Sequence, residues 1–341
     1  MKNLFGWIKQ NQALHKVGIL AVSGVAVHLI LPQITALENS WQVLKSMNFW
    51  AVGLALTAQV LSYLGSGFLL QSILAMAHQK VSLWLNTLIV FGSTSIGIFT
   101  GGMVGSAAAI YRWTSGSKGS MQGATLASIF WPLFNNIMLV LVSIFGLVHL
   151  IVAHNLTQAQ LVGFVAALLI LVLIIGSAAL VVRFWDRATK AILWMSSRVA
   201  RLRRKSFDSD ATRQGAGDLF NAWDAVWQGA WLRPALGAFL NVVFDMLTLY
   251  FLFRAAGVNI SPGMLLAGYG LPLLLGKVAF IIPGGVGVVE SSMAVLYNGL
   301  GVPQAATVVV ELGYRLISFW IPSLAGFPIA AYLERSHSKA P

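Results

Sequence analysis

Six stretches of the chain are apolar over about 20 residues or more, the length that an α-helix needs to cross a lipid bilayer. They run over residues 17–37, 48–77, 122–153, 160–182, 234–253 and 304–333. Because the bilayer interior offers no water to backbone polar groups, such stretches fold as helices. Only 9% of the 341 residues are charged, whereas a soluble domain carries about 25% charged residues. The sequence therefore predicts an all-α polytopic membrane protein.

Two more apolar stretches, residues 81–113 and 262–298, are interrupted near their middle. The first contains Gly101 and Gly102, and the second contains the run Pro283–Gly287 with its three glycines. Proline and closely spaced glycines break a helix, so each stretch is expected to form two short helices. Glycines also permit a tight turn and close helix packing. We therefore predict that each stretch is a re-entrant helical hairpin with its glycines at the tip, inside the membrane.

The distribution of basic residues favours hairpins over full crossings. If each broken stretch enters and returns on the same side, 18 of the 22 Lys and Arg residues lie on one side of the membrane, and only Lys45 and Arg254 lie on the other. Positively charged loops stay in the cytoplasm, so both termini are predicted to be cytoplasmic. The two hairpins then enter from opposite sides, as in the inverted repeats of many transporters.

Two segments of the first half resemble segments of the second half in the same order. Residues 99–106 resemble the glycine-rich run after residue 282, and residues 121–125 resemble residues 303–307. The matches favour an internal repeat, although chance similarity between Gly- and Ala-rich helices would look the same. The predicted segments are an amphipathic lead with an uncleaved first span (1–47), repeat 1 (48–155), a linking span (156–182), a basic amphipathic cytoplasmic segment (183–231), repeat 2 (232–333) and a cytoplasmic tail (334–341).

The basic segment has helical periodicity. Apolar residues recur every three or four positions from Trp185 to Leu202, with basic residues between them. A helix with this pattern lies on an anionic membrane surface. The cluster expected to hold lipid headgroups comprises Arg201, Arg203, Arg204 and Lys205. The alternative is that these residues only determine topology.

Five ionisable residues lie within sequence that is otherwise typical of membrane spans, where a charged side chain is costly and marks a candidate functional residue. Glu290 follows the glycine-rich break, while Glu311 and Arg315 share one face of the last span. Arg315 is too deep to reach the interface easily, so its partner is Glu290, Glu311 or Asp245. The predicted substrate pathway comprises Glu290, Arg315, Glu311, Lys277, Asp245, Gly284, Gly285, Gly287, Gly101 and Gly102. A purely structural ion pair is the alternative.

Motifs of soluble catalysis are absent from the sequence. The Gly285-x-Gly287-x-x-Glu290 spacing only superficially resembles a dinucleotide-binding loop, because no soluble strand precedes it. His149 and His154 form a poor metal site without a nearby carboxylate, and the chain has no cysteine. Basic residues flank apolar spans, which favours anionic lipid over nucleic acid as their partner. We expect no catalytic residues, no metal and no cofactor.

A motif in the last third of the chain resembles a known family; it comprises Pro283–Glu290, Gly301, Ala305, Arg315 and Pro322. The chain resembles the membrane domain of lysylphosphatidylglycerol synthase/flippase proteins in its single-domain form, roughly from the second span to Leu333. The resemblance implies a bacterial or archaeal plasma-membrane protein that moves, or helps to process, a lipid or lipid-linked sugar. It also implies that Glu290 and Arg315 occupy the family's acid and arginine positions. The first repeat differs, since residues 100–106 contain no acid.

The predicted function is movement of an anionic phospholipid or a polyprenyl-phosphate carrier across the plasma membrane. No soluble aminoacyltransferase domain is recognisable at either end, so the resemblance favours translocation over synthesis. Two alternatives stay open: a proton- or ion-coupled transporter of a small solute, with Glu290 as the proton carrier, and a membrane enzyme or accessory protein for lipid-linked sugars. Membrane lipids are the expected partners, and a homo-oligomer stays open.

Overall fold

The computed structural model describes residues 40–100, 102–115, 121–153, 158–183, 194, 217, 230–278 and 283–338. This part of the chain is helical and contains no strand. Its elements are α3 (Trp41–Lys45), α4 (Phe49–Met76), α5 (Leu83–Phe99), α6 (Met103–Thr114), α7 (Met121–Val152), α8 (Gln158–Arg183), α11 (Leu232–Ala255), α12 (Pro262–Val278), η2 (Pro283–Gly285), α13 (Val288–Gly299), α14 (Gln304–Arg315), η3 (Leu316–Trp320) and α15 (Ile321–Ser338). The first predicted span and nearly all of the basic segment lie outside the described residues.

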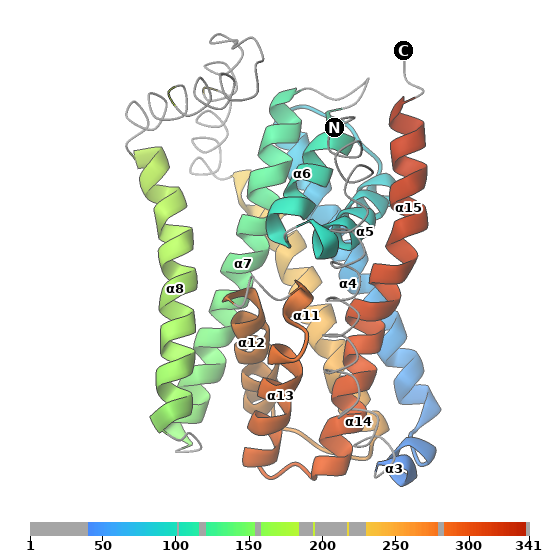
Figure 1. The fold of residues 1–341 in the computed structure, drawn as a ribbon, viewed down its shortest axis with the longest axis vertical. Helices are drawn as coiled ribbons and strands as arrows, with labels where there is room; N and C mark the ends of the chain where they lie inside the picture. Colours follow the sequence, from blue (N-terminus) through green and yellow to red (C-terminus); the bar gives the residue numbers. More distant parts are fainter. Residues whose placement is uncertain are drawn as a thin grey trace, which may run out of the picture.

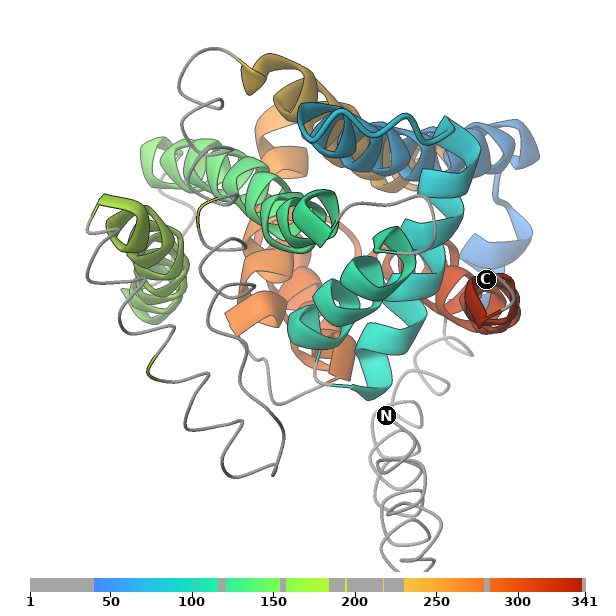
Figure 2. The same ribbon diagram turned by 90° about the horizontal axis from the view of Figure 1, so that it is seen from above.

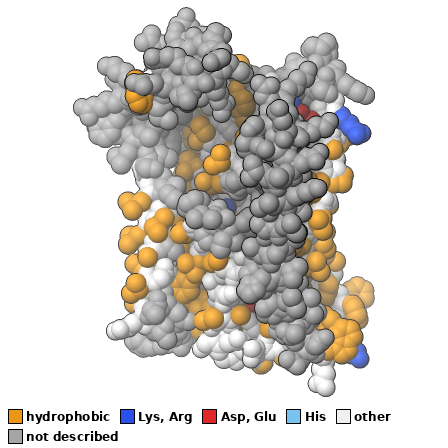
Figure 3. All heavy atoms as spheres, in the orientation of Figure 1, with side chains coloured by type: hydrophobic (Ala, Val, Ile, Leu, Met, Phe, Trp, Pro, Cys, Tyr) orange, Lys and Arg blue, Asp and Glu red, His pale blue; other side chains and the backbone are white. Residues whose placement is uncertain are grey.

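Four helices of the described part are long and apolar enough to cross a membrane, which agrees with the predicted all-α membrane class. They are α4, α7, α11 and the continuous helical segment formed by α14, η3 and α15. Figures 1 and 2 show them side by side as the body of a helical bundle, with α8 next to α7 at one edge. Large apolar side chains such as Trp50 and Val60 are exposed on this bundle, and hydrophobic side chains extend along the described helices in Figure 3. Such a surface suits contact with lipid.

Helices α4 and α11 form the most extensive pairing in the bundle, and small residues bring their backbones together. A Cβ atom added to Gly237 would lie 2.6 Å from the Cα atom of Leu69. Farther along the interface, Asn241 Nδ2 donates to the Ser62 carbonyl oxygen at 3.0 Å, and Ser62 Oγ donates to the Asn241 carbonyl oxygen at 3.0 Å. Close backbone approach and interhelical hydrogen bonds are the usual means of holding membrane helices together.

The shorter helices form two packed pairs, which occupy opposite halves of the bundle. The pair of α5 and α6 lies in the upper half of Figure 1, and the pair of α12 and α13 lies in the lower half. Each pair packs with the long helices into a different buried core: one includes Ile89 and Ile110, and the other includes Tyr269, Met293 and Tyr297. The broken stretches of the sequence therefore fold as paired short helices.

Each short pair packs on a long helix from the other half of the chain. Helix α12 packs on α7, and α5 packs on α15. Glycines form both interfaces: a Cβ atom on Gly146 of α7 would lie 2.6 Å from Ala267 Cα, and one on Gly326 of α15 would lie 2.7 Å from the Phe91 carbonyl oxygen. The two halves are therefore interlocked rather than placed side by side.

Candidate functional site

Glu290 and Arg315 form a buried ion pair in the second half of the bundle. Glu290 is the third residue of α13 and Arg315 is the last residue of α14; their exposed fractions are 5% and 4%. Arg315 Nε lies 2.6 Å from Glu290 Oε1, and Arg315 Nη2 donates to the Gly284 carbonyl oxygen at 3.0 Å. Of the three partners that the sequence left open for Arg315, the structure places Glu290 in direct contact.

Glycines with positive φ build the backbone around this pair. Gly284, Gly285 and Gly287 have φ values of 64°, 63° and 87°, in the region that residues with a Cβ atom rarely adopt. Their turn directs the backbone N–H group of Gly287 at Glu290, and this group donates to Glu290 Oε2 at 2.6 Å. Glu290 therefore neutralises both Arg315 and the positive N-terminal end of α13.

A π-helical turn, η3, follows Arg315 directly and lies within the last long helical segment. It places the Phe319 ring next to the guanidinium, with Arg315 Cζ 4.1 Å from the ring centroid. The ring covers the guanidinium on one side and adds a cation–π contact. Sequence reasoning predicted one uninterrupted final span and missed this turn; π-turns occur often at functional sites.

Asp245 belongs to a different polar cluster from the ion pair. Its Oδ2 accepts from the hydroxyl groups of Tyr269 and Tyr314, both at 2.8 Å, and the Gln59 side chain lies next to the same carboxyl group. The sequence did not single out the two tyrosines, because an aromatic residue at helical spacing usually indicates only packing. Tyr314 directly precedes Arg315, so the two clusters are neighbours along α14.

The other predicted pathway residues form no hydrogen bond with the ion pair in the described part of the chain. Glu311, one turn before Arg315, is 6% exposed, and no hydrogen bond or ion pair joins it within the described part of the chain, although it interacts electrostatically with Glu290 and Arg315. Lys277 is exposed near the end of α12, and within the described residues it forms no ion pair with Glu290, whose partner is Arg315. Gly102 begins α6 with a φ of 63°. Gly101, Arg201, Arg203, Arg204 and Lys205 lie outside the described residues.

A cavity of about 250 Å³ lies beside the ion-pair helix, between α8, α12 and α13. Phe164, Leu275, Val295 and Leu296 give it a mostly apolar lining, and Ser291 and Ser292 also line it. Both serine hydroxyl groups donate to backbone carbonyl oxygens of α13. The cavity therefore presents apolar surface along α13, the helix that carries Glu290.

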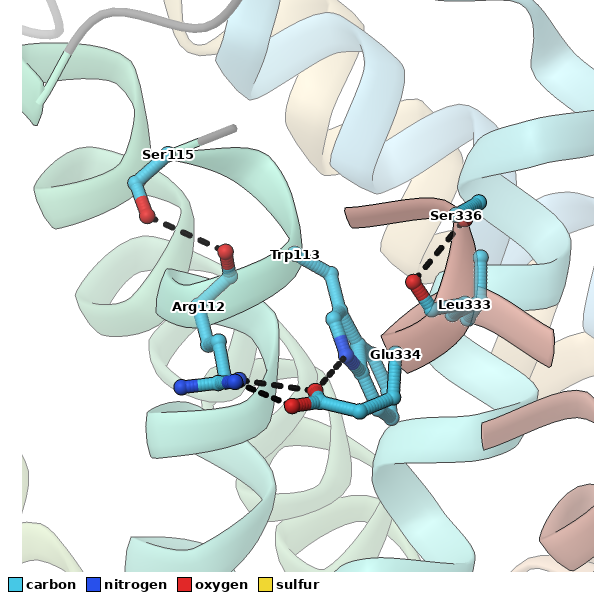
Figure 4. Close-up of polar contacts among 6 residues, drawn as sticks. All are labelled: Arg112, Trp113, Ser115, Leu333, Glu334 and Ser336. Atoms are coloured by element: carbon cyan, nitrogen blue, oxygen red, sulfur yellow. Dashed lines mark hydrogen bonds and ion pairs between the residues drawn. The ribbon is translucent and has the colours of Figure 1, made fainter. Parts of the chain in front are cut away.

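A second ion pair joins α6 to α15, far from Glu290 in the sequence. Figure 4 shows Arg112 and Trp113 of α6 directed at Glu334 of α15. Arg112 donates to both carboxylate oxygens of Glu334, and Trp113 Nε1 donates to Glu334 Oε2 at 3.3 Å. Both charged side chains are partly exposed, so this pair connects α6 to α15 near the surface.

No group of three or more metal-ligating residues is present among the described residues.

The fold and the ion pair together define a polytopic α-helical membrane protein with a buried acid–base pair at a break between helices. The chain belongs to the family whose model is described as the lysylphosphatidylglycerol synthase TM region, which matches residues 17–326. It is 31% identical over 102 residues to a UPF0104 membrane protein of Methanothermobacter thermautotrophicus, 37% identical over 82 residues to one of Pyrococcus horikoshii, and 23% identical over 153 residues to one of Methanocaldococcus jannaschii. These matches cover 30%, 24% and 44% of this chain, and 30%, 24% and 45% of the relatives.

Proposed function

We propose that this protein moves lipids with an anionic headgroup from one leaflet of the plasma membrane to the other. The buried Glu290–Arg315 pair at the start of α13 carries the proposal. A helix N-terminus and an arginine are the two groups that proteins most often use to bind phosphate. Both are directed here at the same carboxylate, so Glu290 occupies the position in which a substrate phosphate would bind.

The proposal includes two re-entrant hairpins related as inverted repeats. Helices α6 and α13 have 12 residues each, which corresponds to about 18 Å of helix. The hydrocarbon core is about 30 Å thick, so neither helix is long enough to cross it. The opposite placement of the two pairs in Figure 1 supports a binding site near the midplane, where transporters with broken helices bind their substrates.

The substrate phosphate displaces Glu290 in this mechanism. Phosphate oxygens accept from Arg315 and from the N–H groups at the start of α13, and Glu290 takes up a proton as it leaves. The cavity between α8, α12 and α13 offers apolar surface for part of an acyl chain. Lipid movement then depends on pH through Glu290.

Reconstituted vesicles test the proposal. Labelled phosphatidylglycerol is followed between leaflets over a pH series, with labelled phosphatidylcholine as the comparison. Arg315→Lys keeps the charge but loses the planar pair of N–H groups that would bind the phosphate in this mechanism. Losing one charge-assisted hydrogen bond costs about 1.5–3 kcal/mol, so we expect movement to slow at least about tenfold. Glu290→Gln should fold and lose the part of the pH dependence that Glu290 supplies.

The matched control is Arg254→Lys, because Arg254 is exposed at the end of α11 and has no part in the proposed site. It should move lipid at the parent rate. Parent-like movement by both Arg315→Lys and Glu290→Gln at every pH would make the ion pair structural and would sink the mechanism.

A further inference from the structure

The cluster around Asp245 brings side chains of four helices to one partly buried carboxyl group. Asp245 lies on α11, Tyr269 on α12, Tyr314 on α14 and Gln59 on α4. Both tyrosine hydroxyl groups donate to Asp245 Oδ2 at 2.8 Å, and their rings pack edge to face with centroids 6.4 Å apart. Tyr269, Tyr314 and Gln59 are all at least 94% buried. Burying several polar groups in an apolar bundle is costly, and such groups within membrane spans mark candidate functional sites.

The hydrogen-bonding partners of Asp245 in the described part of the chain are all neutral. Arg315 is close enough to interact electrostatically with Asp245, but its Nε and Nη2 atoms are engaged by Glu290 and by the Gly284 carbonyl oxygen. A partly buried carboxylate that is hydrogen-bonded only to neutral, buried side chains is unfavourable when ionised, and binding a proton neutralises it.

Gln59 supplies a second, independent observation. It is 6% exposed, and its Oε1 atom has no hydrogen-bond partner among the described residues. A carboxamide has a donor end and an acceptor end, so Gln59 can serve either state of its neighbour. It can donate from Nε2 to the ionised carboxylate, and after turning over it can accept from the O–H group of the protonated acid. Protonation of Asp245 thus provides the donor that Oε1 lacks.

We propose that Asp245, Gln59, Tyr269 and Tyr314 form a proton-binding site distinct from the Glu290–Arg315 pair. The carboxylate takes one proton from water and becomes a neutral acid hydrogen-bonded to Gln59. The titratable and charged groups that face it are Tyr63 of α4, Tyr269 of α12, and Tyr314 and Arg315 of α14. Helix α7 also packs on α11, and His149 near its far end is its sole titratable residue.

The site is linked to the ion pair through adjacent residues. Hydrogen bonds to an ionised carboxylate are about twice as strong as bonds between neutral groups, so protonation of Asp245 weakens its hold on both tyrosines. Tyr314 directly precedes Arg315, and Tyr269 lies on the helix that leads to the glycine turn. The proton therefore loosens the two helices that position the ion pair. This link to lipid movement rests on the proposed function, whereas proton binding itself does not.

Infrared difference spectroscopy of the full chain in lipid nanodiscs tests proton binding directly. The carbonyl band of a protonated carboxylic acid should grow as the pH is lowered, and Asp245→Asn should abolish the part of that band assigned to this residue. Tyr269→Phe removes one donor to the ionised form and should move the midpoint of the band to higher pH. Glu334→Gln is the control, because Glu334 is bonded to Arg112 and Trp113, and it should leave the midpoint unchanged.

Three results would overturn the proposal: a titrating band that survives in Asp245→Asn, an Asp245 band that is constant at every pH, or a midpoint that shifts with sodium concentration, which would indicate a sodium site.

Lipid movement provides the second readout. Asp245→Asn should move lipid with a weakened pH dependence, and unchanged pH dependence would refute the link. If the parent moves no lipid while the Asp245 band titrates, the proposed function fails and the proton site stands.

Discussion

At the residue scale, three glycines set the geometry of the ion pair, because they direct the carbonyl group of Gly284 at Arg315 and the N–H group of Gly287 at Glu290. Gly284→Ala tests this dependence. Its φ of 64° is costly for alanine, and the new Cβ atom would collide with the Phe319 ring. A left-handed conformation costs about 1–2 kcal/mol for a residue with a Cβ atom.

We expect Gly284→Ala to lower the thermal stability in detergent and to weaken phosphatidylglycerol movement. Gly53→Ala is its control, because Gly53 lies inside α4 with no atom near its added Cβ. Alanine there should stabilise the protein by about 0.5–1 kcal/mol. Equal melting temperatures for the two variants would show that the turn does not need its left-handed glycine.

The sequence predicted Glu290 and Arg315 because each charge is conspicuous in apolar surroundings. It reduced the partners of Arg315 to three acids but could not choose among them, since the choice depends on how α13 and α14 cross. It could not predict the Asp245 cluster either. Tyr269 and Tyr314 are 24 and 69 residues from Asp245, and nothing local distinguishes them from packing residues.

At the element scale, the two stretches are interrupted where the sequence predicted. Helix α5 ends at Phe99 and α6 begins at Met103, on either side of Gly101 and Gly102, and α12 and α13 lie on either side of the run Pro283–Gly287. Proline and glycine break helices through local sterics, so their effect is readable from sequence. The π-turn after Arg315 could not be predicted, because its residues Leu316–Trp320 include no proline or glycine and are typical of an ordinary apolar helix.

The membrane placement of the short pairs can be measured by cysteine labelling, since the chain has no cysteine of its own. With re-entrant pairs, Ser117→Cys should react with a membrane-impermeant maleimide from the cytoplasmic side and Asn298→Cys from the outside. Asn298 is exposed near the end of α13. Reaction of Ser117→Cys from the outside would show that α5 and α6 do not return to the cytoplasm as a pair.

At the scale of the whole molecule, the pairing of α4 with α11 joins the two halves of the chain along their length. Gly237→Ala tests this junction, because its Cβ atom would press on the backbone of Leu69. Overpacking of a tight interface costs about 1–3 kcal/mol, so the melting temperature in detergent should fall. Gly176→Ala on α8, which has open space around it, should not lower it. A Gly237→Ala protein as stable as the parent would mean that the α4–α11 interface accommodates the added methyl group and does not depend on this close contact.

The interlocked packing of the short pairs also constrains how the protein is made. Helix α5 is translated well before α15, whose surface covers it, and the bond between Arg112 and Glu334 spans 222 residues. The first pair must therefore wait, with one face uncovered, until α15 has been made. Insertion machinery or surrounding lipid has to shield that face meanwhile, and two separately expressed halves should each be short-lived in the cell and persist only when produced together.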